Sequence, residues 1–277
     1  MSASDRNPVI TLLSDYGAGN ELVGALHGVI ARICPQAHVI DLSHAVAPQN
    51  VRGGADVLAQ ALRYAPLGVH VAIVDPAVGG ERRAVALRCR DRRILVGPDN
   101  GLLWPACQAG GGVEHAVEIS HSAWRLEPVS ATFHGRDIFA PVAAHLAAGS
   151  SLQQAGEPLR TDLLVRLADD AARVADGVLA VHVLNIDRFG NVQLGARPRD
   201  LAELGARLGD RLTVSFESCE PRPATYARTF GDVAYGALVV FEDSARRLAI
   251  ASNRGSAAID LGLRAGDRVS LLLAGGR

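Results

Sequence analysis

The first half of the chain alternates short apolar runs with segments in which apolar residues recur every three to four positions. Residues 9–13, 39–42 and 69–74 are apolar runs rich in β-branched side chains, as in the buried strands of a parallel sheet. Between them, residues 22–33 and 50–64 carry apolar side chains at helical spacing. Strands that alternate with helices in this way predict an α/β domain with a mostly parallel sheet covered by helices.

The pattern changes after residue 84. Residues 84–89 and 93–96 predict a pair of strands, and a helix is expected to follow residue 137 and to extend to Leu146. Beyond Gly177, short apolar runs separated by turn signals predict strands at 178–184, 211–216, 237–241, 248–252 and 268–273. Such spacing is typical of a small antiparallel sheet or barrel. We therefore expect an N-terminal α/β domain at residues 1–174 and a smaller C-terminal antiparallel β-barrel-like domain at 175–277.

Composition narrows the class of protein. The 277 residues include 28 Lys+Arg and 29 Asp+Glu, a net charge of −1. A chain with this balance has no net positive charge to attract nucleic acid or an anionic membrane. All the basic residues are Arg, so a mechanism that needs a Schiff-base or P-loop lysine is excluded. The start of the chain lacks the apolar core of a signal peptide, and no apolar run reaches the length of a membrane span. Four scattered cysteines (Cys34, Cys89, Cys107 and Cys219) predict reduced, mostly buried thiols in a cytoplasmic protein.

Polar residues gather in turns that follow apolar runs. They are Asp15, Asp75, Arg82, Asp99, Asn100, His134, Asp137, Asp187 and Asn191. Turns favour Asp and Asn for local reasons, so about half of this set is expected without any function.

Asp75, Arg82 and His134 have complementary chemistry. A turn after Asp75 brings Arg82 back toward it, and a guanidinium keeps a neighbouring carboxylate ionised and fixed in direction. Such an ion pair also serves simply to clamp a turn. With an imidazole at a helix start, however, the set can position and polarise water. Carboxylates and imidazole also bind metals, so a metallohydrolase with Asp75, Asp99, His134 and Asp137 as ligands is an open alternative.

Five motifs occur in order along the chain. They are Ser14-Asp15-Tyr16-Gly17, Val74-Asp75-Pro76 followed by Arg82, Gly97-Pro98-Asp99-Asn100-Gly101, Phe133-His134-Gly135-Arg136-Asp137 and Asp187-Arg188-Phe189-Gly190-Asn191. Together they resemble the motifs of the S-adenosyl-L-methionine hydrolases, also called S-adenosyl-L-methionine hydroxide adenosyltransferases, which are relatives of fluorinating and chlorinating enzymes. The resemblance covers residues 9–273.

The resemblance implies a reaction and an assembly. Water or hydroxide displaces methionine from the ribose C5′ of S-adenosyl-L-methionine, which gives adenosine and L-methionine without a metal or cofactor. The family also implies an N-terminal α/β domain, a C-terminal β-barrel-like domain and a homotrimer. Its sites lie between the N-terminal domain of one subunit and the C-terminal domain of its neighbour.

The resemblance also implies roles for single residues. Asp75, Arg82 and His134 hold and activate the water. Asp15 binds the ribose hydroxyls. The remaining substrate contacts are Asp187 to the methionine amino group, Phe189 and Asn191 to adenine, Ser244 to the methionine carboxylate, and the backbone at Asn253 and Arg254 to adenine.

Three positions depart from the family pattern. Asn20, a further substrate-binding position, stands where many relatives have an aspartate. Gln193-Leu194-Gly195 replaces a common Thr-Asn, and Ala245 replaces the arginine that halogenating relatives place beside the serine. These departures leave open a non-catalytic adenosine- or S-adenosyl-L-methionine-binding protein. The Asp75, Arg82 and His134 set favours water over halide as the nucleophile.

Overall fold

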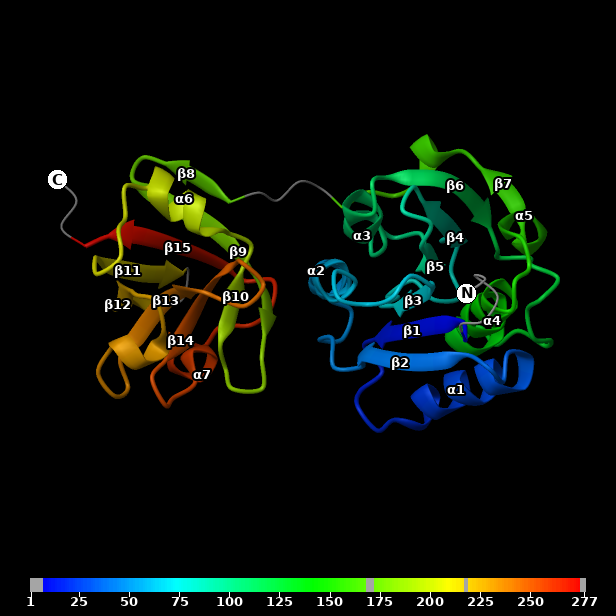
Figure 1. The fold of residues 1–277 in the computed structure, drawn as a ribbon. Helices are drawn as coiled ribbons and strands as arrows, with labels where there is room; N and C mark the ends of the chain where they lie inside the picture. The colour runs from blue at the N-terminus through cyan, green and yellow to red at the C-terminus, as the bar shows by residue number, and fades with distance from the viewer. Residues whose placement is uncertain (1–6, 168–171, 217–218, 275–277) are drawn as a thin grey trace. The chain divides into compact units, whose positions relative to one another are not determined.

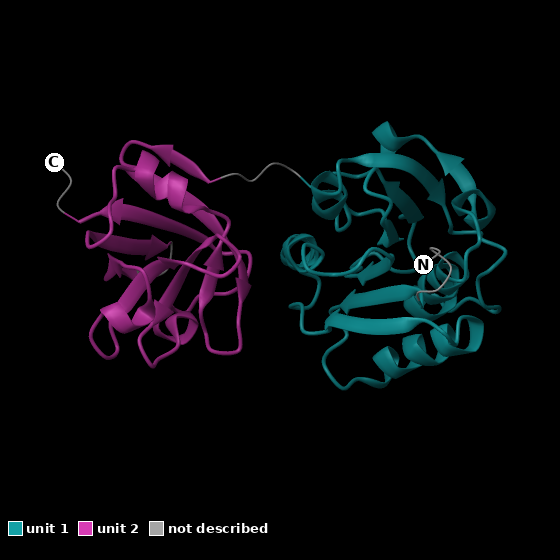
Figure 2. Cartoon of the chain, viewed as in Figure 1, with its two compact units in different colours: residues 1–167 teal, residues 168–277 magenta. Residues whose placement is uncertain are grey.

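The chain folds into two compact units, residues 1–167 and 168–277 (Figure 2). The computed structural model describes residues 7–167, 172–216 and 219–274. The domain boundary expected after residue 174 stays a prediction; it falls within the short strand β8 (Arg173–Ala175). Residues 168–171, just before that boundary, lie outside the described residues.

Unit 1 is a seven-stranded sheet in the order β2-β1-β3-β5-β4-β6-β7 (Figure 1). The four strands β2, β1, β3 and β5 run parallel, whereas β4, β6 and β7 pair in antiparallel fashion. The prediction of a mostly parallel α/β sheet is therefore confirmed for its core. The strands are β1 (Val9–Ser14), β2 (His38–Ser43), β3 (Val69–Ile73), β4 (Ala84–Cys89), β5 (Ile94–Pro98), β6 (Val113–Glu118) and β7 (Glu157–Leu159).

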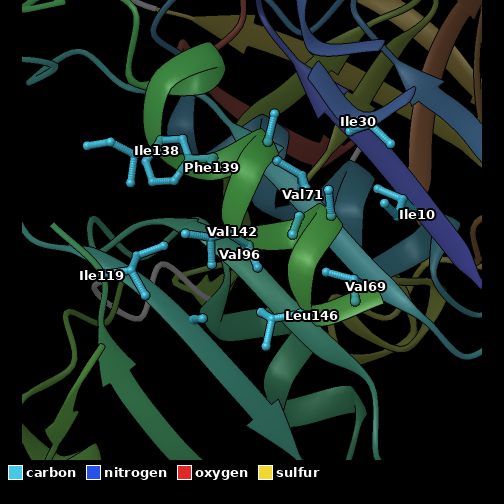
Figure 3. Close-up of a cluster of buried hydrophobic side chains, with 14 of the residues drawn as sticks. Ile10, Ile30, Val69, Val71, Val96, Ile119, Ile138, Phe139, Val142 and Leu146 are labelled. Carbon is cyan, nitrogen blue, oxygen red and sulfur yellow. The ribbon is translucent and has the colours of Figure 1, made fainter. Parts of the chain in front are cut away.

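Helices cover both faces of this sheet because its central strands are apolar on both sides. On β3, Val69, Val71 and Ile73 pack in one cluster with α1 and α4 (Figure 3), while Ala72 packs in another with α2 and α3. Alternate side chains of a strand point to opposite faces, so a single apolar strand contributes side chains to both hydrophobic cores. The helices are α1 (Glu21–Ile33), α2 (Val51–Ala61), α3 (Trp104–Ala109), α4 (Ala140–Ala147) and α5 (Leu152–Ala155).

Unit 2 is a closed β-barrel. Its strands follow the order β10-β14-β13-β12-β11-β15-β9, and the β10–β9 pair closes the ring, with β8 added outside β9. All pairs are antiparallel except β12 with β13, which run parallel. The predicted barrel-like β domain is confirmed, with one parallel pair. Its elements after β8 are β9 (Val178–Ile186), β10 (Val192–Leu194), α6 (Pro198–Glu203), β11 (Arg211–Phe216), β12 (Cys219–Tyr226), β13 (Leu238–Glu242), β14 (Leu248–Ser252), α7 (Ala257–Leu261) and β15 (Arg268–Leu273).

The cysteines in unit 1 are structural. Cys34, Cys89 and Cys107 are buried free thiols. The Cys219 side chain lies outside what the structure describes. Within the described ranges, no helix has both the length and the apolar character needed to cross a membrane.

Candidate active site

Asp75 and Arg82 form a buried ion pair just beyond the C-terminal end of β3. Arg82 Nε donates to both carboxylate oxygens of Asp75, at 3.1 Å to Oδ1 and 2.9 Å to Oδ2, and Nη2 donates to Oδ2 at 2.6 Å. The side chains of Asp75 and Arg82 are only 4% and 8% exposed. Three charge-assisted hydrogen bonds away from water fix the direction of the carboxylate.

The turn between the two residues depends on a glycine. The Gly80 amide donates to the Ala77 carbonyl oxygen at 3.0 Å, and Gly79 adopts a φ of +78°. A Cβ atom at Gly79 would also overlap the carbonyl oxygen of Ala131. Only glycine meets both requirements, so the Pro-Ala-Val-Gly-Gly sequence is what returns Arg82 to Asp75.

His134 reaches the same ion pair from a different element. It precedes a wide, π-helical turn (Gly135–Phe139) that leads into α4. His134 Nδ1 lies 2.7 Å from Arg82 Nη2, so Nδ1 accepts this hydrogen bond and the neutral ring carries its proton on Nε2. Burial, and then the positive charge of Arg82, lower the pKa of His134 below its ordinary value, so the ring is neutral at pH 7. Arg82 thus hydrogen-bonds to both of the other residues expected to be catalytic, Asp75 and His134.

The cluster borders open space within unit 1. Arg82 and His134 line a pocket of about 560 Å³, together with Glu118, His121 and Glu127. The Arg82 guanidinium also lies 5.4 Å from the centre of the Phe139 ring, which supports it from the core side. A rigid cluster that borders a pocket can act on a small molecule or on water.

Asp15 and Asn20 lie in the loop between β1 and α1. The Asp15 amide donates to the Ile73 carbonyl oxygen at 3.3 Å, which ties this loop to the end of β3. One Asp15 oxygen accepts the Gln49 amide at 2.9 Å. Asn20 caps α1: its side chain accepts from the Leu22 amide at 3.0 Å and donates to the backbone of the preceding turn. Both polar groups of the Asn20 side chain therefore have structural partners.

In unit 2, Asp187 organises the turn between β9 and β10. Its Oδ1 accepts the amides of Phe189 at 2.8 Å and Asn191 at 3.0 Å, and its Oδ2 accepts Asn191 Nδ2 at 2.8 Å. The turn leaves the Phe189 side chain 64% exposed. Such exposure is unusual for a large aromatic side chain and suits a surface that stacks on a flat ligand.

An open pocket of about 860 Å³ gathers the predicted adenine contacts. Its lining includes Asp187, Phe189, Asn191, Asn253 and Arg254. Asn253 Nδ2 donates to the Val233 carbonyl oxygen at 2.8 Å, and the Arg254 guanidinium lies 5.8 Å from the Tyr235 ring centre. Both side chains thus have partners within unit 2, and the Asn253 amide also donates to the Ala237 carbonyl oxygen at 3.1 Å.

Ser244 lines an adjoining pocket of about 370 Å³ that shares Asp187 and Asn191 with the first. Phe230 borders both pockets and is 51% exposed. The sequence-based reasoning missed this residue, although an aromatic directly before the Gly231-Asp232 turn was a usable signal.

The four residues of the metal-dependent alternative do not form one centre. Asp99 accepts Arg83 Nη2 at 2.6 Å and the Val165 amide at 2.9 Å, and Asp137 accepts Arg136 Nε at 2.7 Å. Over residues 7–167, 172–216 and 219–274, no group of three or more His, Cys, Asp or Glu is arranged to hold a metal ion. The described geometry gives the metallohydrolase hypothesis no support.

Comparison with known proteins places these observations in one family. Residues 10–156 match the SAM hydroxide adenosyltransferase N-terminal domain, and residues 181–270 match the C-terminal domain. A protein of Salinispora tropica named (R)-S-adenosyl-L-methionine hydrolase is 50% identical over 95% of this chain and 97% of its own. A fluorinase of Nocardia brasiliensis is 32% identical over 98% of both chains. The crystal structure of an uncharacterized conserved protein from Thermotoga maritima, 35% identical, superposes with a TM-score of 0.85 over 95% of this chain and 99% of that one.

A buried carboxylate–guanidinium pair with a half-buried imidazole beside it, at the end of a parallel sheet, and an open aromatic pocket on a β-barrel unit define an enzyme suited to polar chemistry on a small molecule. The matches cover both units and share the fold. The chain belongs to the SAM hydroxide adenosyltransferase family.

Proposed function

We propose that the protein hydrolyses S-adenosyl-L-methionine to adenosine and L-methionine. The observation that carries the proposal is the hydrogen-bonded Asp75, Arg82 and His134 cluster, which suits activation of water. The names of similar proteins support the substrate and specify its R epimer at sulfur. We accordingly propose the R epimer as the preferred substrate.

The reaction makes few chemical demands on the protein. The water oxygen forms a bond to C5′ while the C5′–S bond breaks and its electron pair returns to sulfur. Methionine leaves as a neutral thioether, so no acid has to protonate it, and one proton of the water is released. Alignment of the water with the C5′–S bond supplies on the order of 7 kcal/mol, and general-base assistance adds about 3 to 5 kcal/mol.

Asp75 is the proposed proton acceptor. Arg82 occupies the only lone pair of the neutral His134 ring, so that ring has no free acceptor site. Asp75 Oδ1 accepts only one of the three hydrogen bonds from Arg82 and retains a free acceptor site. In this proposal Arg82 and His134 hold the carboxylate in place and balance charge as the proton moves.

The proposed substrate contacts follow the two groups of residues described above. Asp15 binds the ribose hydroxyls, while Phe189, Asn191 and the backbone at Asn253 and Arg254 bind adenine. Asp187 and Ser244 bind the amino and carboxylate groups of methionine. Asn20 acts on this site through the turn that it caps, since its side chain is already engaged.

We also propose that the enzyme works as a homotrimer in the cytoplasm. Family membership supports the trimer, and the three buried free thiols suit a reducing compartment. Sedimentation equilibrium of the purified protein tests the trimer, since a monomeric mass at working concentration would reject it.

One incubation tests the reaction. EDTA-treated protein is mixed with the separated R and S epimers of S-adenosyl-L-methionine in H₂¹⁸O, with and without chloride, and the products are analysed by mass spectrometry. The proposal expects ¹⁸O in the 5′-hydroxyl of adenosine, equal rates with and without EDTA, and faster turnover of the R epimer. Absence of turnover would favour a binding protein, loss of activity with EDTA a metal-dependent hydrolase, and a 5′-chloro product a halogenase.

A further inference from the structure

The Tyr16 hydroxyl lies against Gly135, the residue after His134, and has no hydrogen-bonding partner among the described residues. Its ring packs edge-on against Phe133, with centroids 5.8 Å apart. Across the described ranges, the structure gives no hydrogen bond to Tyr16 Oη, although the Tyr16 backbone bonds to Ser14 and Asn20. A phenylalanine would pack equally well here, so the ring alone does not account for the hydroxyl.

Gly135 places this hydroxyl next to His134. A Cβ atom built on Gly135 would overlap Tyr16 Oη. Gly135 directly follows His134 in the wide turn before α4, so Oη touches the backbone that carries the imidazole. The missing side chain at residue 135 thus makes room for the hydroxyl.

The surroundings keep Tyr16 protonated. Burial, and then the negative charges of Asp15 and Asp75, raise its pKa well above the ordinary value, while Arg82 acts in the opposite direction. A phenol that keeps its proton donates a hydrogen bond but does not serve as a base. It therefore complements Asp75, which accepts.

We propose that Tyr16 is a further catalytic residue, whose hydroxyl donates a hydrogen bond to the oxygen of the attacking water. The inference rests on the proposed hydrolysis. One lone pair of the water oxygen bonds to C5′, the other accepts from Tyr16, and one proton passes to Asp75. Tyr16 keeps its own proton throughout, and its hydrogen bond holds the water so that the other lone pair points at C5′.

The first test removes one atom. Tyr16→Phe is expected to lower kcat about tenfold, with KM for S-adenosyl-L-methionine and the melting temperature unchanged. The kcat profiles of variant and parent should run parallel with pH, because a donor that never titrates does not shape the profile. Tyr64→Phe, at an exposed position in the segment between α2 and β3, is the matched control and should retain full activity. A Tyr16→Phe enzyme with parental kcat overturns the assignment, as does loss of the basic limb of its pH profile.

A double-mutant cycle with Gly135 gives a second test. Gly135→Ala should lower kcat at least tenfold when Tyr16 is present, because the new methyl group displaces the hydroxyl. In the Tyr16→Phe background the same change should alter kcat less than threefold, since the nearest remaining atoms are the flexible ends of Ile73, at 3.2 Å, and Leu26, at 3.4 Å. Equal effects in the two backgrounds would refute the inference. If the parental enzyme itself does not turn over, the proposed function fails and this assignment fails with it.

Discussion

Arg82 is the residue on which the proposed catalytic cluster of Asp75, Arg82 and His134 depends, because its guanidinium donates to two different acceptors. It donates three hydrogen bonds to Asp75 and one to His134, and its side chain is almost fully buried. A planar fork of donors can satisfy a carboxylate and an imidazole at once, whereas a lysine ammonium is a point charge on a flexible stem. The cluster therefore requires the shape of Arg82 as well as its charge.

The substitution Arg82→Lys tests this requirement. We expect kcat to fall at least 100-fold, because Lys cannot hold Asp75 and His134 in their present directions. Steady-state kinetics on S-adenosyl-L-methionine measures the loss. Arg83→Lys is the matched control: Arg83 pairs with Asp99, away from the cluster, and its variant should keep kcat within about threefold of the parent. An Arg82→Lys enzyme with near-parental kcat would show that charge alone is sufficient.

The residues of the cluster were predictable to different degrees. The return of Arg82 to Asp75 follows from the local sequence, since two glycines and a proline between an apolar strand and an arginine predict a tight turn. The contact of His134 with Arg82 depends on how α4 packs on the sheet, which no local pattern contains; only the resemblance to a family predicted it. Asn20 illustrates the reverse case, because local geometry gives it a capping role that the resemblance did not imply.

At the scale of elements, the buried strands were predicted, whereas strands that are very short or contain proline were missed. The strands β1, β3 and β5 were predicted because both of their faces are apolar. The short strands β7 and β10 have three residues each, too few to show the alternation of apolar and polar residues that predicts a strand. In β12, Pro221 and Pro223 argued against a strand. The parallel pairing of β12 with β13 depends on tertiary contacts, so local sequence does not predict it.

The turn after β3 is expected to lose its present geometry if Gly79 is replaced. Gly79→Ala should lower both the melting temperature and kcat, because alanine strains the positive φ and its Cβ overlaps the Ala131 carbonyl oxygen. Gly112→Ala separates the two effects: its φ is +95°, but nothing lies within 4 Å of the added Cβ. Calorimetry and kinetics on both variants should show a small stability loss with full kcat for Gly112→Ala. Equal kcat in the two variants would contradict a positioning role for the turn.

Strand β3 also carries a buried histidine, which links stability to pH. Burial, and then the positive charge of Arg93, lower the pKa of His70 to about 4, with Asp91 acting in the opposite direction. The unfolded chain binds this proton near the ordinary value of about 6.5, so the contribution of His70 to stability is complete above pH 6.5 and declines as pH falls toward 4. The loss at pH 5 should be about 2 kcal/mol, at about 1.4 kcal/mol for each pH unit.

Urea denaturation at pH 7.5 and pH 5 measures this loss. His70→Val should reduce the difference in unfolding free energy between the two pH values by about 2 kcal/mol. His38→Val, at an exposed position on β2, which β1 separates from β3, is the control and should leave that difference as in the parent. An unchanged difference in the His70 variant would mean that another group dominates the acid response.

At the scale of the whole molecule, each unit contains what it needs to fold. Unit 1 has a core on each face of its sheet, and unit 2 has a core inside its barrel. No strand of one sheet pairs with the other sheet among the described residues. The two-part organisation was predictable because the apolar pattern changes from strand–helix alternation to strands alone. The ring closure by β9 and β10 was not, because it joins segments by tertiary contact.

Fragments 1–167 and 168–277 are therefore expected to fold independently when expressed separately. Each should show a cooperative thermal transition and dispersed amide resonances, because each unit buries a hydrophobic core of its own. Circular dichroism and NMR spectra of the two fragments provide the measurement. Fragment spectra that do not sum to the spectrum of the intact chain, or a fragment without a cooperative transition, would show that the units depend on each other.

The arrangement of the strands also bears on aggregation. Among the described strands of unit 2, ring closure leaves a free edge on the three-residue β8. In unit 1, the outer strand β7 has three residues with Pro158 at its centre, and β2 carries Asp41, which hydrogen-bonds to His27 and lies 3.1 Å from His44 Nε2. Short strands, proline and charge at an edge all hinder the addition of a strand from another molecule. Among its described residues, the protein thus offers no long, regular edge from which a fibril could grow.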